Sequence, residues 1–466
     1  DILPETRTGV HRMPKASDIL ACPGPPGLRQ SDRITKEYEI SIVTPLFGGG
    51  AVAGEIDETL PIRASAIRGH LRHWWRTTIG HTLADGMWQR EEEVFGSAEF
   101  PSPLDVTVLE QPTLRPVDPA DPGYDGSFGP IAYALFSAIG NHRQVAEQGS
   151  RFRLRLTWDK PGTLANRRAG QNAQRQHERR PLLPPAIEDI EPDVTAACQT
   201  WLTLGGIGAR TRRGCGAVFC ANSLPRVTGV RAAIFVAAPT TTALDAWKTA
   251  VEVYRTFRQT PRGKRHLKTT PSGTVNRVPG RSHWPEPDSI RAITGCALRA
   301  PGGPTPGVPT DEDPKDHSTT LVPPSLLPAF PRAILGLPIN FHFSDYPGRN
   351  LPGRRDRDPQ DVQLLPAFSA TSDPLDRMYS PVITRPLWIN GAWRPAVIIL
   401  QRQLPTNLRF RLVGEQASIG GAYLSRDIGP ERVIDPSLGA IGPMRGCASA
   451  LDALRTFLLS NGFTVK

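Results

Sequence analysis

Arginine and glycine are concentrated in one short segment, Leu204–Val218, which holds five glycines and three arginines. Glycine permits positive φ angles, and because it has no Cβ atom it lets a ligand approach the backbone closely. The arginine guanidinium presents a planar set of donors that suits phosphate oxygens. This composition therefore predicts a loop that lies against a polyanion. A flexible basic turn is the alternative interpretation.

Two nucleotide-binding motifs are excluded for this segment. A P-loop requires a lysine directly after its last glycine, and no lysine follows a glycine here. A dinucleotide-binding fingerprint that starts at Gly206 requires glycine or alanine five residues later, where the chain has Thr211. We therefore expect no nucleotide cofactor in this loop, and we predict no cofactor for the chain.

A second basic segment, Pro61–Ile79, has the spacing of an amphipathic helix, with Ser65 as its expected N-cap. The apolar stripe of this helix consists of Ile67, Leu71, Trp74, Trp75 and Ile79. A second row at i, i+4 and i+8 consists of Arg68, Arg72 and Arg76. Like charges at this spacing repel one another, so the row requires either solvent or an anion. Because Arg63 and His73 lie beside it, we favour an anion.

A third basic segment extends from Val253 to Pro285 and contains no acidic residue. A solvated surface normally mixes both signs of charge, so this segment predicts a further contact with a polyanion. The residues to which we assign that contact are Arg262, Lys264, Arg265 and Lys268.

The composition favours a folded protein with an anionic partner. Hydrophobic residues make up 39% of the 466 residues, which excludes a disordered chain and allows several domains. The formal net charge is +10, and nucleic acid is the first partner expected at such a charge. The six cysteines form no Cys-x-x-Cys pair, so we expect reduced thiols and no metal site. With no apolar run of membrane-spanning length, a cytoplasmic protein without membrane contact is expected.

Strand and helix patterns occur in two successive blocks. In the first block, the expected strands and helices give the order β-α-β-β-α-β, which is typical of a ferredoxin-like unit. The strands are Tyr38–Thr44, Leu104–Glu110, Phe152–Trp158 and Ala217–Cys220, and Pro192–Leu204 is the second helix. Residues 111–130 are expected to form a loop, and Arg167–Arg180 a mobile basic loop.

The second block begins near residue 229 and predicts a second unit of the same kind. Its expected elements are strands at Val230–Ala238, Ala333–Phe343 and Ala396–Gln403 and helices at Leu244–Phe257 and Leu451–Leu459. The predicted fold class is thus α+β, with two ferredoxin-like domains and long Pro/Gly-rich insertions. The domains are 33–228 and 229–466, after a flexible N-terminal arm at 1–32, and the insertions are 300–328 and 345–376.

Seven segments taken in order carry a resemblance to one family. They are Ile42–Gly49, Pro61–Arg76, Glu93–Ser97 and Gly205–Gly214 in the first half, and His283–Asp288, Phe330–Pro338 and Asp376–Val382 in the second. Over about residues 34–400, the chain resembles the RAMP proteins of CRISPR systems, and among them the family of the first-numbered subunit of the type III-B Cmr effector complex. The N-terminal arm and the Pro-rich insertions depart from the family pattern.

The resemblance implies two RRM-related RAMP domains in a multisubunit ribonucleoprotein. In that family, this subunit lies at the head of the complex near the crRNA 3′ end, beside the backbone RAMP subunit and a second head RAMP, and helps to capture target RNA. Target cleavage and cyclic oligoadenylate synthesis belong to other subunits. The family's glycine-rich loop corresponds to Gly205–Gly216 and its helix motif to Arg63–Arg76. The RNA-binding residues predicted in these two segments are Arg63, Ser65, Arg68, Arg72, His73, Arg76, Gly205, Gly206, Gly208, Arg210, Arg212, Arg213 and Gly214.

An endoribonuclease is the alternative to a non-catalytic RNA-binding subunit. Metal-free RNA cleavage would require a histidine base, and His70, His73 and His81 lie close together in the sequence. Packing or phosphate contact is the favoured role of these histidines. Among the carboxylates, the loop residue Asp57 is the one to test, although a solvated turn residue is favoured, and Glu91–Glu93 has the pattern of a simple charge run. A purely structural scaffold is the third possibility.

Overall fold

The computed structural model describes residues 32–50, 52, 54–98, 101–119, 129–139, 141, 143–183, 188–223, 229–259, 266–269, 275–278, 282–294, 323–342, 361–367, 369, 373–401, 407–412 and 428–466. The expected N-terminal arm lies almost entirely outside these residues, and so does most of the expected insertion at 300–328. The division of the chain at residue 228 stays a prediction.

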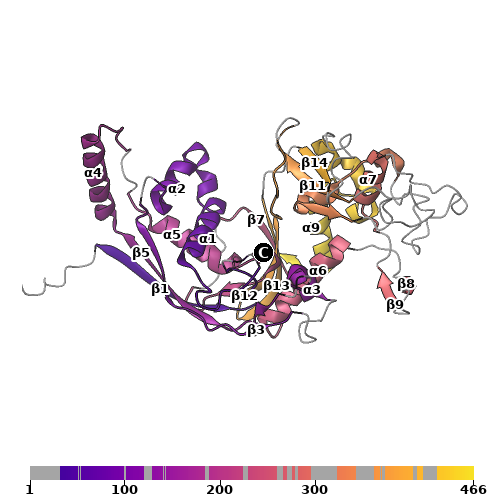
Figure 1. The fold of residues 1–466 in the computed structure, drawn as a ribbon, viewed down its shortest axis with the longest axis horizontal. Coiled ribbons are helices and arrows are strands. Elements are labelled where there is room, and N and C mark those ends of the chain that lie inside the picture. Colours follow the sequence, from indigo (N-terminus) through magenta and orange to yellow (C-terminus); the bar gives the residue numbers. More distant parts are fainter. Residues whose placement is uncertain are drawn as a thin grey trace, which may run out of the picture.

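The first sheet has four antiparallel strands in the order β2-β5-β1-β6. The strands are β1 (Arg33–Ile42), β2 (Leu104–Glu110), β5 (Arg151–Asp159) and β6 (Val218–Phe219). Helix α1 (Ala64–Thr77) lies between β1 and β2 in the chain, and α5 (Glu191–Leu204) leads into β6. The two helices pack together on one side of the sheet (Figure 1). The expected β-α-β-β-α-β order is therefore present in the first half.

The two faces of this sheet differ because side chains alternate along β1 and β5. The face toward α1 and α5 is apolar, and Leu154 and Trp158 are fully buried there. On the opposite face, charged side chains pair across the strands. Arg153 contacts both Glu37 and Glu110, at 2.9 and 2.6 Å. The opposite face is thus a ladder of ion pairs in contact with solvent.

The second sheet repeats this arrangement with the order β12-β13-β7-β15. Its strands are β7 (Ala232–Val236), β12 (Val382–Ile389), β13 (Ala392–Leu400) and β15 (Thr464–Val465). Helix α6 (Ala243–Gln259) packs on β12 and β13, and α9 (Ala450–Ser460) leads into β15. All neighbouring strands are antiparallel. The connection β7-α6-β12-β13-α9-β15 therefore matches the connection of the first sheet.

A smaller sheet with the order β10-β11-β14 is inserted into the second half. Its strands are β10 (Ile339–Phe341), β11 (Val362–Ala367) and β14 (Asn407–Leu412). Two further strand pairs are β3 (Pro116–Val117) with β4 (Val145–Ala146), and β8 (His266–Thr269) with β9 (Val275–Val278).

One prediction for this region is corrected. The expected strand Ala333–Phe343 is a strand only at β10, because Pro331–Leu335 forms a 3₁₀ turn. A short buried apolar run does not distinguish a strand from a helical turn, whereas Pro331 at the first helical position favours the turn. The expected insertion at 345–376 contains the buried strand β11.

Among the described residues, the remaining α-helices are α2 (Met87–Phe95), α3 (Pro130–Ile139), α4 (Pro161–His177) and α7 (Glu286–Thr294). Most of the expected mobile loop Arg167–Arg180 belongs to helix α4, so that prediction is wrong. Pro161 occupies a favourable first-turn position, and many of the residues that follow it are good helix formers. Arg167 also joins the helix to the first sheet through the buried Asp159, at 2.6 Å.

The apolar cores of the two sheets meet. Trp158 and Trp201 of the first half lie in the same buried cluster as Ile383 and Ile398 of the second. At this junction, the buried Arg385 of β12 donates hydrogen bonds to first-half carbonyl oxygens, including that of Val218 at 3.0 Å. Burial lowers the pKa of Arg385, to about 9. The two halves are therefore joined by apolar packing and by a buried polar contact.

Among the described residues, no helix combines the length and the apolar character needed to cross a lipid bilayer.

Candidate nucleic-acid interface

The Gly-Arg loop, Leu204–Val218, is fixed by backbone hydrogen bonds on both of its arms. Within the loop, the amide of Ile207 donates to the carbonyl of Gly216 at 2.9 Å. The loop also bonds the strand-to-loop segment that follows β1, where the amide of Ala209 donates to the carbonyl of Phe47 at 2.6 Å. Two of the family-like segments, Ile42–Gly49 and Gly205–Gly214, are thus in direct contact.

The glycines of this loop are explained by contacts within the protein. Gly208 and Gly214 have φ angles of +76° and +74°, which side chains rarely tolerate. A Cβ atom at Gly208 would lie 2.6 Å from the carbonyl oxygen of Phe47, and one at Gly214 would overlap the carbonyl oxygen of Thr384. Cβ atoms at Gly205 and Gly206 would likewise lie 2.6 and 2.8 Å from backbone oxygens. The close approach that these glycines allow is to the chain's own backbone, and their contact with RNA stays a prediction.

Arg210 is held against helix α3. The residue adopts a left-handed conformation with φ of 58°. Its Nε donates to the hydroxyl of Ser137 at 2.9 Å, and its Nη1 donates to the carbonyl of Ala134 at 3.2 Å. The guanidinium carbon lies 4.3 Å from the centre of the Phe136 ring. Desolvation lowers the pKa of Arg210. These contacts fix the position of the guanidinium without any ligand.

Arg213 connects the loop to helices α3 and α6. Its guanidinium carbon lies 4.4 Å from the ring centre of Tyr133 and 5.3 Å from that of Tyr254. The indole of Trp247 donates to the carbonyl of Arg213 at 2.6 Å. Burial acts to raise the pKa of Tyr133, but the charges of Arg258 and Arg213 outweigh it and lower that pKa. Arg213 is therefore part of the junction between the two halves.

The loop and helix α1 meet at Arg212 and His73. Nη2 of Arg212 lies 3.2 Å from Nε2 of His73. Each side chain belongs to a different predicted RNA-binding segment, so the fold does bring the two segments together. Both residues are half-buried and keep part of their surface toward solvent.

A carboxylate of the protein itself pairs with two arginines of the row on helix α1. Glu91 of helix α2 is 1% exposed, and its carboxylate accepts hydrogen bonds from Arg72 Nε at 2.8 Å and from Arg76 Nη2 at 2.6 Å. Desolvation acts to raise the pKa of Glu91, but the hydrogen bonds from Arg76 and Arg72 outweigh it and lower that pKa. The view of Glu91–Glu93 as a simple charge run is therefore wrong at its first residue. The sequence does not show that α2 folds back along α1.

Arg68 and Arg72 line an open groove with a volume of about 670 Å³. The other lining residues are Phe95, Gly96, Ser97, Ala98, Pro101, Ser102 and Asp105, several of them from the family-like segment Glu93–Ser97. Nη2 of Arg68 donates to the carbonyl of Leu104 at 2.8 Å, and desolvation lowers the pKa of this arginine. The groove therefore combines two cations with the small residues of a second motif.

Arg63 and Ser65 take positions that differ from the prediction. The helix starts at Ala64, so Arg63 is its N-cap residue and Ser65 is a first-turn residue; no side chain caps this end. Arg63 donates through Nη2 to the carbonyl of Gly50, at 3.1 Å, and to that of Gly49. Arg63 thus joins helix α1 to the loop that follows β1, and Ser65 is exposed.

The predicted contacts of the acid-free segment fall largely outside the described residues. Arg262, Lys264 and Arg265 are not among the described residues, and Lys268 is described only as part of strand β8. Their assignment to RNA stays a prediction.

Two of the candidate catalytic residues, His70 and Asp57, have structural partners. His70 is stacked on Trp201 with a centroid separation of 6.5 Å, and desolvation lowers the pKa of His70. A carboxylate oxygen of Asp57 accepts hydrogen bonds from the amides of Thr59 and Leu60, at 3.1 and 2.8 Å. These contacts fit a packing histidine and a turn-stabilising aspartate.

Within the described part of the chain, no group of histidine, cysteine and carboxylate side chains has the arrangement of a metal site. Cys198, Cys215, Cys220 and Cys447 are free thiols.

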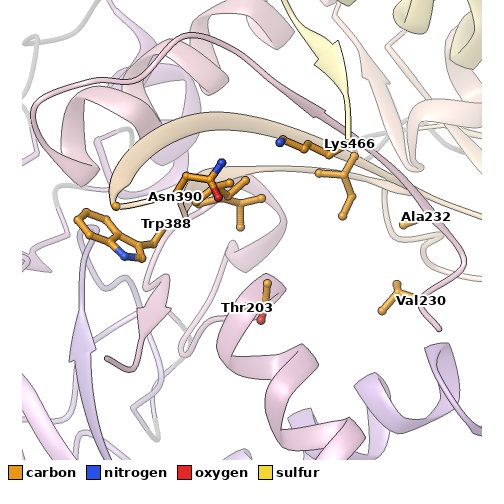
Figure 2. A pocket seen from close by; sticks show the side chains of 10 residues that line it. Thr203, Val230, Ala232, Trp388, Asn390 and Lys466 are labelled. Atoms are coloured by element: carbon orange, nitrogen blue, oxygen red, sulfur yellow. The ribbon is translucent and has the colours of Figure 1, made fainter. Parts of the chain in front are cut away.

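A cavity of about 520 Å³ lies apart from these arginines, at the junction of α5 with the second sheet (Figure 2). Its wall includes the apolar residues Ala232, Ile234 and Leu387, and the polar residues Asn390 and Lys466 also line it. Thr203 also lines it, but its hydroxyl donates to the carbonyl of Gln199 at 2.7 Å. No predicted RNA-binding residue lines this cavity.

Residues 39–218 match the family model of the RAMP superfamily. This segment of the first half is similar to RAMP proteins and is termed the RAMP domain here. The match begins in β1 and ends in β6, so the matched segment includes helix α1, the groove and the whole Gly-Arg loop. No curated protein matches the sequence of this chain.

Three solved structures show a more distant similarity. The apo crystal structure of Cmr1 from Pyrococcus furiosus has 14% identity and a TM-score of 0.41, over 93% of this chain and 98% of that chain. A chain of the Type III-B Cmr-beta complex with cognate target RNA and AMPPnP has 12% identity and a TM-score of 0.36, over 91% and 99%. A chain of Cmr-beta bound to cognate target RNA has 17% identity and a TM-score of 0.24, over 41% and 59%. The resemblance to the RAMP superfamily rests on the sequence match over residues 39–218, because structural similarity at this level carries no functional argument.

Proposed function

We propose that this chain is a non-catalytic RNA-binding subunit of a type III-B CRISPR Cmr ribonucleoprotein effector complex. It would lie at the crRNA 3′-end head, beside the backbone RAMP subunit and a second head RAMP, and help to capture complementary target RNA in the cytoplasm. The seven family-like segments and the RAMP match at residues 39–218 support this proposal. The related connections of the two four-stranded sheets favour two ferredoxin-like RAMP domains.

The main observation in favour of RNA binding is the contact between the Gly-Arg loop and helix α1 at Arg212 and His73. Together with the groove at Arg68, this contact places cationic side chains of the loop and of helix α1 on one RAMP domain. Arginines supply affinity for the RNA backbone that does not depend on sequence, while base pairing with the crRNA would supply specificity.

A binding role is favoured over catalysis because two of the candidate catalytic side chains, Asp57 and His70, already serve the fold. Asp57 stabilises its own turn, and His70 is stacked and desolvated. We therefore expect labelled crRNA precursor and target RNA to stay intact in the presence of the purified chain, with and without Mg²⁺. Cleavage that is lost on His73→Ala or Asp57→Asn would support the endoribonuclease instead.

The salt dependence of RNA binding tests the proposal directly. On a single strand, the log–log slope of affinity against salt is about −0.7 for each phosphate neutralised. Arg210 and Arg213 are built into the packing, so Arg212→Gln and Arg68→Gln are the informative variants. Each should make the slope less steep by about 0.7.

Arg151→Gln is the matched control, because Arg151 is an exposed arginine on the ion-pair ladder of the opposite sheet face. Its slope should equal that of the unsubstituted chain. A wild-type affinity that does not respond to salt, or equal slopes for all three variants, would contradict backbone binding at this interface.

A further inference from the structure

An aromatic ring next to the Gly-Arg loop has a role that neither the motifs nor the family match assigns. Phe136 lies on helix α3 and is 61% exposed, whereas its neighbours Ala134, Leu135 and Ala138 are buried. The guanidinium carbon of Arg210 lies 4.3 Å from the centre of the ring, so it covers one face. The large exposed fraction leaves the other face open to a ligand.

The arrangement is fixed in advance. Arg210 is tied to Ser137 and to the carbonyl of Ala134, both on the same helix as Phe136. A guanidinium held over an aromatic ring loses little further freedom when a third flat group joins the stack, which lowers the entropic cost of binding.

The charge around this stack favours a polyanion. Neither Pro130–Ile139 nor Leu204–Val218 contains an acidic residue, whereas the loop supplies Arg210, Arg212 and Arg213. Arg143, which follows α3 in the chain, lies against Gly54 in the neighbouring loop after β1. A flat aromatic face with one arginine stacked on it and further arginines in the adjoining loop is a combination with which proteins bind unpaired bases and their phosphates.

On the basis of the proposed function, we propose that Phe136 and Arg210 form a stacking platform for one unpaired base of the bound RNA. The base would lie on the open face of Phe136, with its phosphates near the arginines of the loop. The platform would hold a splayed nucleotide at the edge of the RAMP domain and would tolerate any base, because every base has a flat π face.

Helix α2 provides a built-in comparison. Trp88 is 63% exposed, and the guanidinium carbon of Arg76 lies 5.1 Å from its ring centre. Arg76, however, is paired with Glu91, and two further glutamates follow Glu91 in the chain. Trp88 therefore matches Phe136 in exposure and in its stacked arginine, but not in local charge.

The test is the affinity of the full chain for a fluorescein-labelled single-stranded RNA of mixed sequence. Phe136→Ala should weaken binding by about 5- to 150-fold, the usual loss when a stacked base loses its ring. Phe136→Tyr should bind like the unsubstituted chain, and Phe136→Leu should resemble Phe136→Ala, because it retains apolar bulk without a ring. Trp88→Ala should change the affinity by less than about 2-fold, and circular dichroism checks that each variant is folded.

The outcomes separate this inference from the proposed function. If the unsubstituted chain binds RNA and both Phe136→Ala and Phe136→Leu bind it equally well, the platform is overturned but the proposed function still stands. An equal loss in Trp88→Ala would also overturn it, as would a Phe136→Ala variant that binds RNA normally but no longer joins the other complex subunits. An unsubstituted chain without affinity for RNA would refute both proposals.

Discussion

Glu91→Gln tests whether the arginine row of helix α1 serves the fold. The substitution preserves the shape of the side chain but removes the negative charge that Arg72 and Arg76 share. We expect the RAMP domain to lose stability. Without the carboxylate, the guanidinium groups of Arg72 and Arg76 would repel each other across one helical turn. We expect RNA binding to stay unchanged.

The magnitude follows from the burial of each partner. Removing one member of a fully buried ion pair costs about 3–5 kcal/mol, because the other charge is left without a partner. Here the carboxylate is buried, but the side chains of Arg72 and Arg76 are 35% and 43% exposed and can be hydrated when it is lost. Hydrogen bonds to charged groups contribute about 1.5–3 kcal/mol, so we expect a loss of about 2 kcal/mol. In a domain of this size, that loss lowers Tm by about 4–8 °C.

Urea and thermal unfolding measure this loss, with Glu92→Gln on the same helix as the control. Glu92 is half-buried, and its substitution should change stability by no more than about 0.5 kcal/mol. The pH dependence adds an independent check. The folded pKa of Glu91 lies below its ordinary value of 4.5, so its contribution is complete above that pH and is lost as the pH falls through the folded pKa. Glu91→Gln should remove this part of the acid sensitivity.

Two results would refute the reasoning. If Glu91→Gln unfolds at the same temperature as the unsubstituted chain, the ion pairs contribute nothing measurable. If it instead steepens the salt dependence of RNA binding, Arg72 and Arg76 become available to phosphate once Glu91 is neutral, and the carboxylate acts as a competitor of RNA.

Three further predictions address the junction, a buried histidine and the thiols. Arg385→Met should lower the urea midpoint of unfolding, because it removes the hydrogen-bond donor of two buried carbonyl oxygens in the first half. Each carbonyl left without a donor costs about 1–3 kcal/mol of stability. An unchanged midpoint would mean that this contact is dispensable. Desolvation lowers the pKa of His70 in the folded chain below its ordinary value of 6.5, so as the pH falls the unfolded chain binds this proton before the folded chain does. The free energy of unfolding should therefore decrease as the pH drops below 6.5. His70→Phe should reduce this decrease, which thermal unfolding between pH 5 and 8 measures. Burial raises the pKa values of Cys198 and Cys215 to about 12, so iodoacetamide should modify the half-buried Cys447 before these two thiols, as mass spectrometry can establish. Equal rates for the three thiols would show that the buried ones become exposed readily.

The strongly periodic elements were predictable from sequence. The stripe from Ile67 to Trp75 gave helix α1, and alternation gave strands β2 and β5 to within a residue. Helix α4 was missed because it buries only Leu164 and therefore shows little amphipathic pattern. Strand β12 is buried along most of its length and shows no alternation, and Thr384, Arg385 and Pro386 interrupt its apolar residues, so it was not predicted.

The partners of the site residues were not predictable, because they come from distant parts of the chain. Glu91 reads locally as one of three consecutive glutamates, and only the packing of α2 on α1 shows that it is the anion of the arginine row. Similarly, the pattern of the Gly-Arg loop cannot distinguish a glycine that faces a phosphate from Gly214, which faces Thr384. The exposed Phe136 lies in an otherwise apolar helix, and no local signal sets it apart.

The contact of Arg385 with the first half has a consequence for synthesis of the chain on the ribosome. Arg385 follows Val218, whose carbonyl it bonds, by 167 residues. At about 5–20 residues per second, translation needs about 8–33 s to cover that separation. During this interval, the RAMP domain has emerged, but the strand that supports its Gly-Arg loop does not yet exist. The loop can therefore reach its final form only after strand β12 has been synthesised, and a nascent chain that lacks β12 has no complete interface for RNA.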